Sequence, residues 1–187
     1  MPDFSIEHGR GEVARRHRSA ICELYDAVFS FPPFVWSEGD SDSHRETLAE
    51  ISADDTFEIV LAIDGRVMVG FAYGHRLPAS HGWWNYFSQE LSPDFTQEWE
   101  GRTFALIDLA VREDRRGGGI GGRLLSSLLD SRTEERAVLS VQPTAAVTKG
   151  IYEHLGWRMV GRKGPIENVL PSYWDIYVLD LKSERQR

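Results

Sequence analysis

The segment Leu109-Ala-Val-Arg-Glu-Asp-Arg-Arg-Gly-Gly-Gly-Ile-Gly-Gly-Arg-Leu-Leu125 decides the fold. It begins as the end of an apolar strand, crosses a short charged link, and reaches five glycines within six positions before an amphipathic helical pattern. The first amide groups of a helix have no partner inside the helix and carry partial positive charge, so they can bind a phosphate. Glycine at these positions lets a ligand approach the main chain closely.

Four interpretations of this turn compete. Some of its glycines fit the dinucleotide-binding pattern G-x-G-x-x-G, but charged residues separate them from their strand, and the next strand ends at Gln142 instead of an acid. A P-loop requires Lys followed by Ser or Thr after its last glycine, whereas Arg123 and Leu124 stand there. A turn that only caps a helix needs fewer glycines. The remaining interpretation rests on a resemblance to a known family.

The stretch from Arg116 to Gly121 fits R-x-x-G-x-G, and with its flanking strand and helix it resembles the acetyl-CoA loop of the GNAT acetyltransferases. Downstream, the sequence VTKGIYEHLGW at 147–157 resembles the family's second motif, a helix that carries a tyrosine and ends in a glycine and an aromatic residue. The resemblance extends from about Phe4 to Leu181. It implies a single GNAT-like α/β domain over 1–187, with a mixed, mostly antiparallel sheet flanked by helices on both faces.

Periodicity and turn residues predict the order of the elements. Asp64 and Gly65 form a two-residue hairpin signal, and a long connection rich in aromatic and acidic residues occupies 75–102, on the acceptor side of the domain. Helices are expected at 13–29, 41–51, 117–131 and 144–155. Strands are expected at 4–7, 56–63, 66–73, 103–111, 137–141, 157–160 and 173–181.

The resemblance also implies which residues bind acetyl-CoA. A backbone amide of the strand before the glycine loop meets the thioester carbonyl, and the loop amides hold the pyrophosphate. The family often has an asparagine near 143–146, where this chain offers only Thr144 as a hydrogen-bonding group. The predicted cofactor-binding residues are Leu109, Ala110, Val111, Arg116, Gly117, Gly118, Gly119, Ile120, Gly121, Gly122 and Thr144.

Two residues are candidates for proton transfer. Tyr152 matches the tyrosine with which the family protonates the departing thiolate, and a phenol, titrating near ~10, holds its proton at neutral pH. The alternative for Tyr152 is a core aromatic residue with a polar tip. Asp108 lies in an otherwise apolar strand, where a carboxylate must be paired, hydrogen-bonded or hydrated. It is either the base or amine anchor of the acceptor pocket, or the structural partner of an arginine.

The acceptor pocket is expected to be lined by Phe34, Trp36 and Trp84, because the family commonly builds this wall from the link between the first two helices and from the long connection. Aromatic rings beside acids suit a cationic amine. The alternatives are a satellite core that pins the loops, or a homodimer interface. We expect direct acetylation of a primary amine on a small-molecule or peptidyl acceptor. Rival hypotheses are another acyl-CoA, an O-acceptor, or a catalytically silent CoA-binding module.

Composition narrows the partners. The formal net charge of −8 disfavours nucleic acid, and no apolar run is long enough to span a membrane. The single cysteine, Cys22, in an amphipathic helical pattern, is expected to be buried and inert, and the lack of a secretion signal favours a cytoplasmic location. The histidines show no metal-ligand spacing, so no metal is expected; they are His8, His17, His44, His75, His81 and His154.

Overall fold

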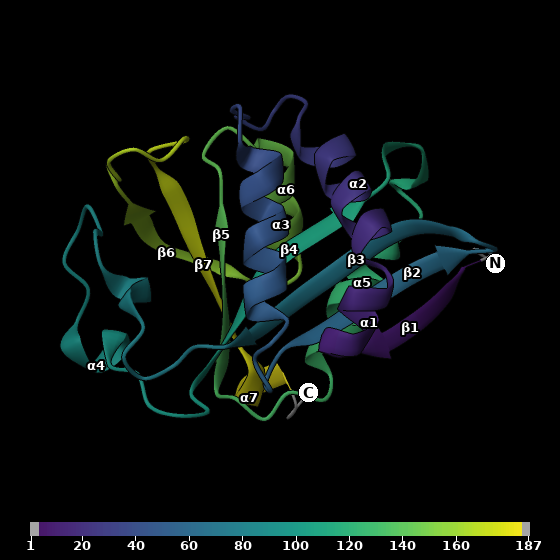
Figure 1. The fold of residues 1–187 in the computed structure, drawn as a ribbon. Coiled ribbons are helices and arrows are strands. Elements are labelled where there is room, and N and C mark those ends of the chain that lie inside the picture. Colours follow the sequence, from purple (N-terminus) through teal and green to yellow (C-terminus); the bar gives the residue numbers. More distant parts are fainter. Residues whose placement is uncertain (1–3, 185–187) are drawn as a thin grey trace. The chain divides into compact units, whose positions relative to one another are not determined.

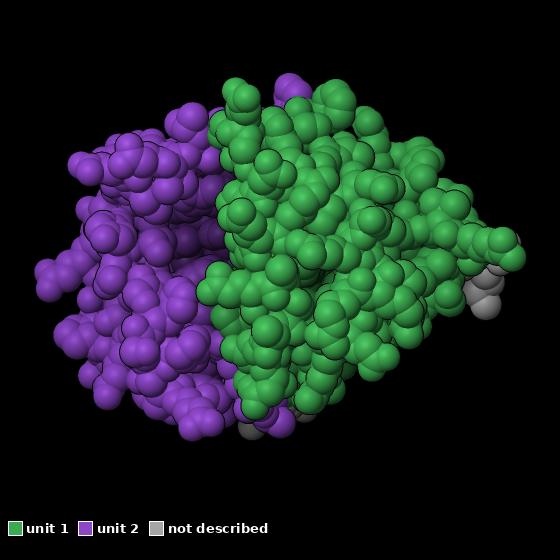
Figure 2. Space-filling view, viewed as in Figure 1, with its two compact units in different colours: residues 1–31, 36–75, 106–132 green, residues 32–35, 76–105, 133–187 purple. Residues whose placement is uncertain are grey.

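The computed structural model describes residues 4–184 and divides into two compact units, shown in different colours in Figure 2. Strand β4 (Thr103–Val111) has its first three residues in unit 2 and the rest in unit 1. Across the described residues, seven strands follow the order β1-β2-β3-β4-β5-β7-β6. Unit 1 comprises Met1–Phe31, Trp36–His75 and Leu106–Arg132, and unit 2 comprises Pro32–Val35, Arg76–Ala105 and Thr133–Arg187.

Unit 1 is built on a hairpin with helices on both of its faces (Figure 1). The middle residues of β2 and β3 are buried in succession without alternation, as expected for strands covered on both sides. Gly70 allows close packing, because a Cβ there would stand 2.9 Å from a side-chain carbon of Leu124 on α5. The elements are β1 (Ser5–Gly9), α1 (Gly11–Arg16), α2 (Arg18–Phe29), α3 (Asp40–Ile51), β2 (Glu58–Asp64), β3 (Val67–Arg76), η2 (Glu113–Arg115) and α5 (Ile120–Leu129).

Two local predictions in this unit are wrong in detail. The hairpin pairs Asp64 with Val67, so its two loop residues are Gly65 and Arg66. Gly65 has φ of +61°, and a glycine at the first loop position is the pattern of a type II′ turn. The single helix expected at 13–29 is two helices, since the chain leaves helical geometry at His17. Cys22 is buried in α2, as predicted.

Unit 2 contains the only parallel pair among the described strands. Strand β4 pairs with β5 in parallel from Thr103 opposite Arg136 to Ala105 opposite Val138, and β7 pairs antiparallel with both β5 and β6. The predicted mixed, mostly antiparallel sheet is therefore confirmed. The elements are η1 (Gly82–Trp84), α4 (Pro93–Thr96), β5 (Arg136–Val141), α6 (Ala146–His154), β6 (Arg158–Lys163), β7 (Trp174–Asp180) and α7 (Leu181–Glu184).

The long connection is ordered by backbone hydrogen bonds to strand β6 and the residue after it. The Ser88 amide donates to the Arg162 carbonyl at 2.9 Å, and the Gly164 amide donates to the Tyr86 carbonyl at 2.8 Å. Phe87 forms an isolated bridge with Lys163 between these bonds. The connection thus lies along β6 like a short extra strand, a long-range pairing that its sequence did not signal. None of the helices within 4–184 has both the length and the apolar character needed to cross a bilayer.

Candidate active site

The amino end of α5 presents free backbone donors. Gly117 and Gly119 have φ of +80° and +77°, in the left-handed region that favours glycine. Gly119 is the N-cap residue of α5, and no side chain caps the helix there. Within the described chain, none of the amides from 117 to 122 donates a hydrogen bond, whereas the Arg123 amide donates to the Gly119 carbonyl at 3.0 Å. Several N–H groups and the positive end of the helix are therefore available to an anion.

The end of β4 lies directly beside this turn. A Cβ on Gly121 would stand 3.7 Å from a methyl of Val111 and 3.8 Å from a methyl of Leu109, so the glycine sits against the strand end. The Arg116 side chain donates from Nε to the Val111 carbonyl at 3.3 Å. These contacts bring together, in unit 1, the strand and the loop predicted to bind acetyl-CoA.

The loop fits a pyrophosphate. A Cβ on Gly117, Gly119 or Gly122 would meet nothing within 4 Å, which leaves open space over the free amides. The neighbouring Arg115 is engaged by Asp64 at 2.5 Å, whereas Arg116 is exposed and has no ion pair among the described residues. Acyl-CoA would supply the acyl thioester, held by these amides and this positive charge.

Valine at both Gly118 and Gly121 is expected to weaken CoA binding by tenfold or more, about 1.4 kcal/mol. Both glycines have ordinary φ values, and an added Cβ would meet no atom closer than 3.6 Å, so the fold should accept a side chain there. Gly119 is unsuitable, because its positive φ would strain any other residue. Calorimetric titration with CoA measures the effect.

Gly150→Val is the matched control for that double variant, because Gly150 lies in the exposed part of α6 with no atom near its Cβ position. CoA affinity should be unchanged in the control. A folded double variant that binds CoA as tightly as the unmodified chain would contradict the assignment of the loop.

Asp108 is held by a tyrosine and not by an arginine. The phenol of Tyr73, on β3, donates a hydrogen bond to Asp108 Oδ2. Tyr73 is fully buried, whereas the Asp108 side chain is 19% exposed. Burial raises the pKa of Asp108 to about 6, and the hydrogen bond from Tyr73 opposes that rise. The carboxylate therefore titrates near neutral pH, as a general base should.

A series of aromatic side chains extends from this pair in unit 1. His44 Nε2, on α3, lies 3.0 Å from the Tyr73 oxygen and 3.9 Å from Asp108 Oδ2. Tyr25, on α2, stacks on His44 with ring centroids 3.6 Å apart and planes 6° apart. Trp36 lies 6.0 Å from Tyr25, centroid to centroid. The structure thus brings two predicted site residues, Trp36 and Asp108, into one cluster. Sequence reasoning missed Tyr25, His44 and Tyr73.

Unit 2 holds the other predicted site residues. Tyr152 is 9% exposed on α6, and its ring packs edge to face against Trp157 at 5.7 Å. Thr144 is exposed in the turn before α6. Phe34 lies in the segment 32–35, which Gln142 binds through both its amide atoms: Oε1 accepts from the Val35 amide at 2.6 Å and Nε2 donates to the Val35 carbonyl at 3.2 Å.

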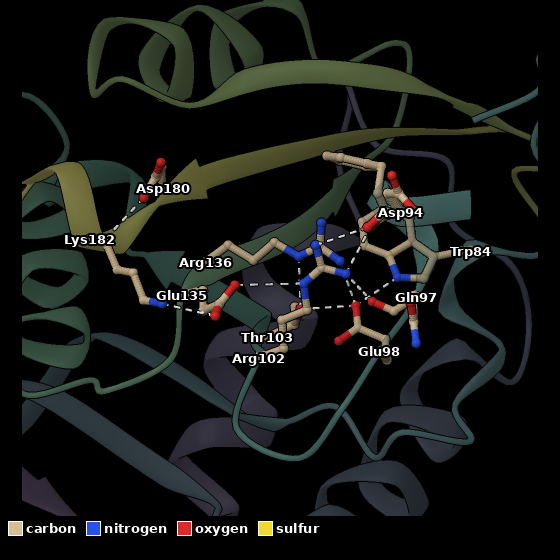
Figure 3. A network of polar contacts seen from close by, with 11 residues as sticks. Trp84, Asp94, Gln97, Glu98, Arg102, Thr103, Glu135, Arg136, Asp180 and Lys182 are labelled. Atoms are coloured by element: carbon tan, nitrogen blue, oxygen red, sulfur yellow. Dashed lines mark hydrogen bonds and ion pairs between the residues drawn. The ribbon is translucent and has the colours of Figure 1, made fainter. Parts of the chain in front are cut away.

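Trp84 belongs to a polar network within unit 2 (Figure 3). Its Nε1 donates to Glu98 Oε1 at 2.7 Å, and the Arg136 guanidinium lies over its ring at 4.7 Å. Arg136 also donates to Glu98 Oε1 at 2.7 Å and to Thr103 Oγ1 at 2.9 Å. The Glu98 side chain is 2% exposed. These contacts engage Trp84 and Oε1 of Glu98 within unit 2, whereas Glu98 Oε2 is buried without a hydrogen-bond partner among the described residues.

No group of three or more His, Cys, Asp or Glu side chains in the described part of the chain could hold a metal ion. The chemistry that these side chains offer is proton transfer at Asp108 and, by the sequence motif, at Tyr152. Both lie in elements whose backbone is regular, β4 and α6.

The model of the acetyltransferase (GNAT) family matches residues 20–157, and the chain belongs to that family. No curated protein sequence matches the chain significantly.

Solved structures share the fold at low sequence identity. The ribosomal-protein-S18-alanine N-acetyltransferase from Escherichia coli superposes with a TM-score of 0.65 at 17% identity, over 95% of this chain and 94% of that one. An acetyltransferase of the GNAT family from Staphylococcus aureus Mu50 gives 0.68 at 15% identity, over 95% and 99%. Arabidopsis thaliana Naa50, in complex with the bisubstrate analogue CoA-Ac-MVNAL, gives 0.60 at 17% identity, over 95% and 99%.

Proposed function

We propose that this protein transfers an acetyl group from acetyl-CoA directly to the primary amine of a small-molecule or peptidyl acceptor, and that the acceptor enters as a cation. The observation that carries the acceptor class is Asp108: a carboxylate in an apolar strand, paired with a phenol, with no arginine or lysine bound to it in the described chain. Such a carboxylate has an oxygen to spare for an ammonium group. Family membership supports the acyl-CoA half of the reaction.

The proton balance assigns the roles. The ammonium group loses one proton to become nucleophilic, its nitrogen attacks the thioester carbonyl, and the carbon–sulfur bond breaks. The amide nitrogen then loses a second proton, so the reaction yields the amide, the CoA thiol and one proton for the solvent. In the proposal Asp108 accepts a proton from the amine, and Tyr152 protonates the thiolate. An amide of 109–111 stabilises the oxyanion.

The aromatic cluster supports a cationic acceptor. Tyr25 and Trp36 place two ring systems in the same cluster as Asp108, and aromatic faces attract cations. Glu98, one of the acidic residues of the long connection at 75–102, is neutralised by Arg136. The attraction therefore rests on Asp108 and on the net charge of −8.

Turnover with matched acceptors tests the proposal. The purified chain is assayed for CoA release with primary amines, with the alcohols that match them, and with peptides whose amino terminus is free or blocked. We expect acetylation of amines alone, and a fall in kcat/KM for cationic acceptors between about 0.05 and 0.5 M salt, because screening shortens the reach of charge. Saturation by acetyl-CoA should change less.

Each other outcome selects a rival hypothesis. Acetylation of the alcohols would indicate an O-acyltransferase. CoA binding without turnover on any acceptor would indicate a silent CoA-binding module. A neutral acceptor used as well as a cationic one, without salt dependence, would refute the cationic acceptor.

A further inference from the structure

Elements α2, α3 and β3 of unit 1 contribute Tyr25, His44 and Tyr73 to the cluster that contains Asp108. Tyr25 and Cys22 from α2 act electrostatically on Tyr73, and His44 from α3 lies within 4 Å of both members of the pair. The charges of Asp26, Asp40 and Arg45 act on Tyr25 or His44. Tyr73 donates a hydrogen bond to the carboxylate, and His44 Nε2 lies 3.9 Å from its Oδ2.

The hydrogen bonds that link His44, Tyr73 and Asp108 have one consistent direction. Tyr73 has a single hydroxyl proton, and it is used on Asp108 Oδ2. The phenol oxygen can then only accept from His44, so His44 carries its proton on Nε2. The other ring nitrogen, Nδ1, is buried and has no hydrogen-bond partner among the described residues. A proton there would leave an unsatisfied buried donor, so this geometry favours the neutral ring.

Burial lowers the pKa of His44 to about 4, with Arg45 acting in the same direction and Asp26 against it. His44 is therefore neutral at pH 7 and acts as a hydrogen-bond donor, not as a cation. The parallel stacking of Tyr25 fixes the plane of the imidazole and so the direction of its Nε2–H. A phenol that accepts a hydrogen bond becomes a stronger donor, because neighbouring hydrogen bonds polarise one another.

We infer that Tyr73 and His44 are positioning residues for the acetyl transfer, which hold Asp108 ionised and fix its Oδ2, so that Oδ1 is left for the acceptor amine. Oδ1 has no hydrogen-bond partner in the described chain, and the side chain is partly exposed. The inference rests on the proposed function, because it assigns a role to the two residues, Tyr73 and His44, that support the proposed base, Asp108. It adds that the base, Asp108, is the last of three hydrogen-bonded side chains, His44, Tyr73 and Asp108, which come from three elements.

Tyr73→Phe tests the first link. Loss of the phenol removes a donor to the carboxylate, so the acid limb of the kcat/KM profile should move to higher pH, and activity below the limb should fall about tenfold for each pH unit of movement. Tyr177→Phe is the matched control. Tyr177 is an equally buried tyrosine that donates to Glu153 Oε1 at 3.0 Å in unit 2, and its loss should leave the profile in place.

His44→Phe tests the second link, because phenylalanine keeps an aromatic ring to stack on Tyr25 and removes the Nε2–H donor. It should move the acid limb in the same direction as Tyr73→Phe but by less. In the Tyr73→Phe background it should cause no further movement, since the link that carries its effect is gone. Independent effects of the two substitutions would overturn the inference.

A direct titration separates this inference from the proposed function. Carbon NMR of the labelled Asp108 carboxyl requires no turnover, and it should show a higher titration midpoint in Tyr73→Phe than in the unmodified chain. Nitrogen NMR should show His44 neutral and protonated at Nε2 at pH 7. An unchanged Asp108 midpoint in folded Tyr73→Phe would overturn the inference even if amines are acetylated. The expected shift without acetylation would refute only the function.

Discussion

Replacing Asp108 with asparagine is expected to slow acetyl transfer by about 10²–10⁴, the range for loss of a general base. The side chain keeps its shape, and its amide oxygen can still accept the hydrogen bond from Tyr73. CoA affinity should be unchanged, because the loop from 117 to 122 is not altered. The assay is kcat/KM for the best amine against pH. The unmodified chain should lose activity as pH falls through about 6, where Asp108 gains a proton.

The same variant should be more stable than the unmodified chain at pH 7. Burial raises the pKa of Asp108 to about 6, above the value near 4 of an unfolded aspartate, so the folded state binds a proton that the unfolded state has released. This difference lowers the free energy of unfolding as pH rises from about 4 to about 6, by up to about 3 kcal/mol. Asparagine removes that cost, and its advantage should vanish below about pH 4. Urea unfolding at several pH values measures it.

Asp175→Asn is the matched control, with the opposite sign. Asp175 is also buried, but its hydrogen bonds from Arg162 and Lys149 outweigh the effect of burial and lower the pKa of its carboxyl. Its loss should destabilise the fold at pH 7, and less so at low pH. An Asp108→Asn variant with full activity, or with reduced stability at pH 7, would contradict the assignment of Asp108 as the base.

The parts of this site that the sequence predicted are local in the chain. The loop from Arg116 to Gly122 is recognisable because glycines, a preceding strand and a following helix stand in one continuous segment. The same holds for the hairpin, whose glycine marks the turn to within one residue. Local sequence signals predict where a segment turns, because the residues that must adopt the turn conformation are the same residues that carry the signal.

The support of Asp108 could not be predicted in this way. Tyr73 lies 35 residues before Asp108, and His44 lies 29 residues before Tyr73, so no periodic pattern relates them. His44 stands in α3, a mostly polar helix with the sequence DSDSHRETLAEI, where the only sign of its burial is its position one turn before the buried Leu48. The available signal was the polar tips of Tyr73 and Asp108 within otherwise apolar strands, since buried polar groups need partners.

The residues predicted to line the acceptor pocket fall into two groups that composition could not distinguish. The sequence grouped Trp36 and Trp84 as two aromatic residues beside acids. Trp36 joins the aromatic cluster of unit 1, whereas Trp84 is engaged by Glu98 and Arg136 in unit 2. Counting acids near aromatics could not show that Glu98 is already paired, because its cation, Arg136, follows 38 residues later.

Arg136→Met is expected to lower the free energy of unfolding by about 3–5 kcal/mol, because it leaves the buried carboxylate of Glu98 without its cation. The carboxylate would keep only the donors of Trp84 and Thr103. The double variant Arg136→Met with Glu98→Gln should recover most of the loss, since a neutral amide can still accept both hydrogen bonds and leaves no unpaired charge. Urea unfolding, with equal m values, measures both.

Lys182→Met is the control for this pair of variants. Lys182 binds Glu135 at 2.8 Å, but the Lys182 side chain is 60% exposed and that of Glu135 is 36% exposed, and ion pairs at the surface contribute little (Figure 3). Stability should therefore hardly change.

The outcome for Arg136→Met also decides what Trp84 does. If Arg136→Met left stability intact and instead weakened the use of one amine acceptor, the network would have to be reassigned from the core of unit 2 to acceptor recognition. The expected loss of stability, with kcat/KM unchanged in the folded fraction, would assign Trp84 to the core.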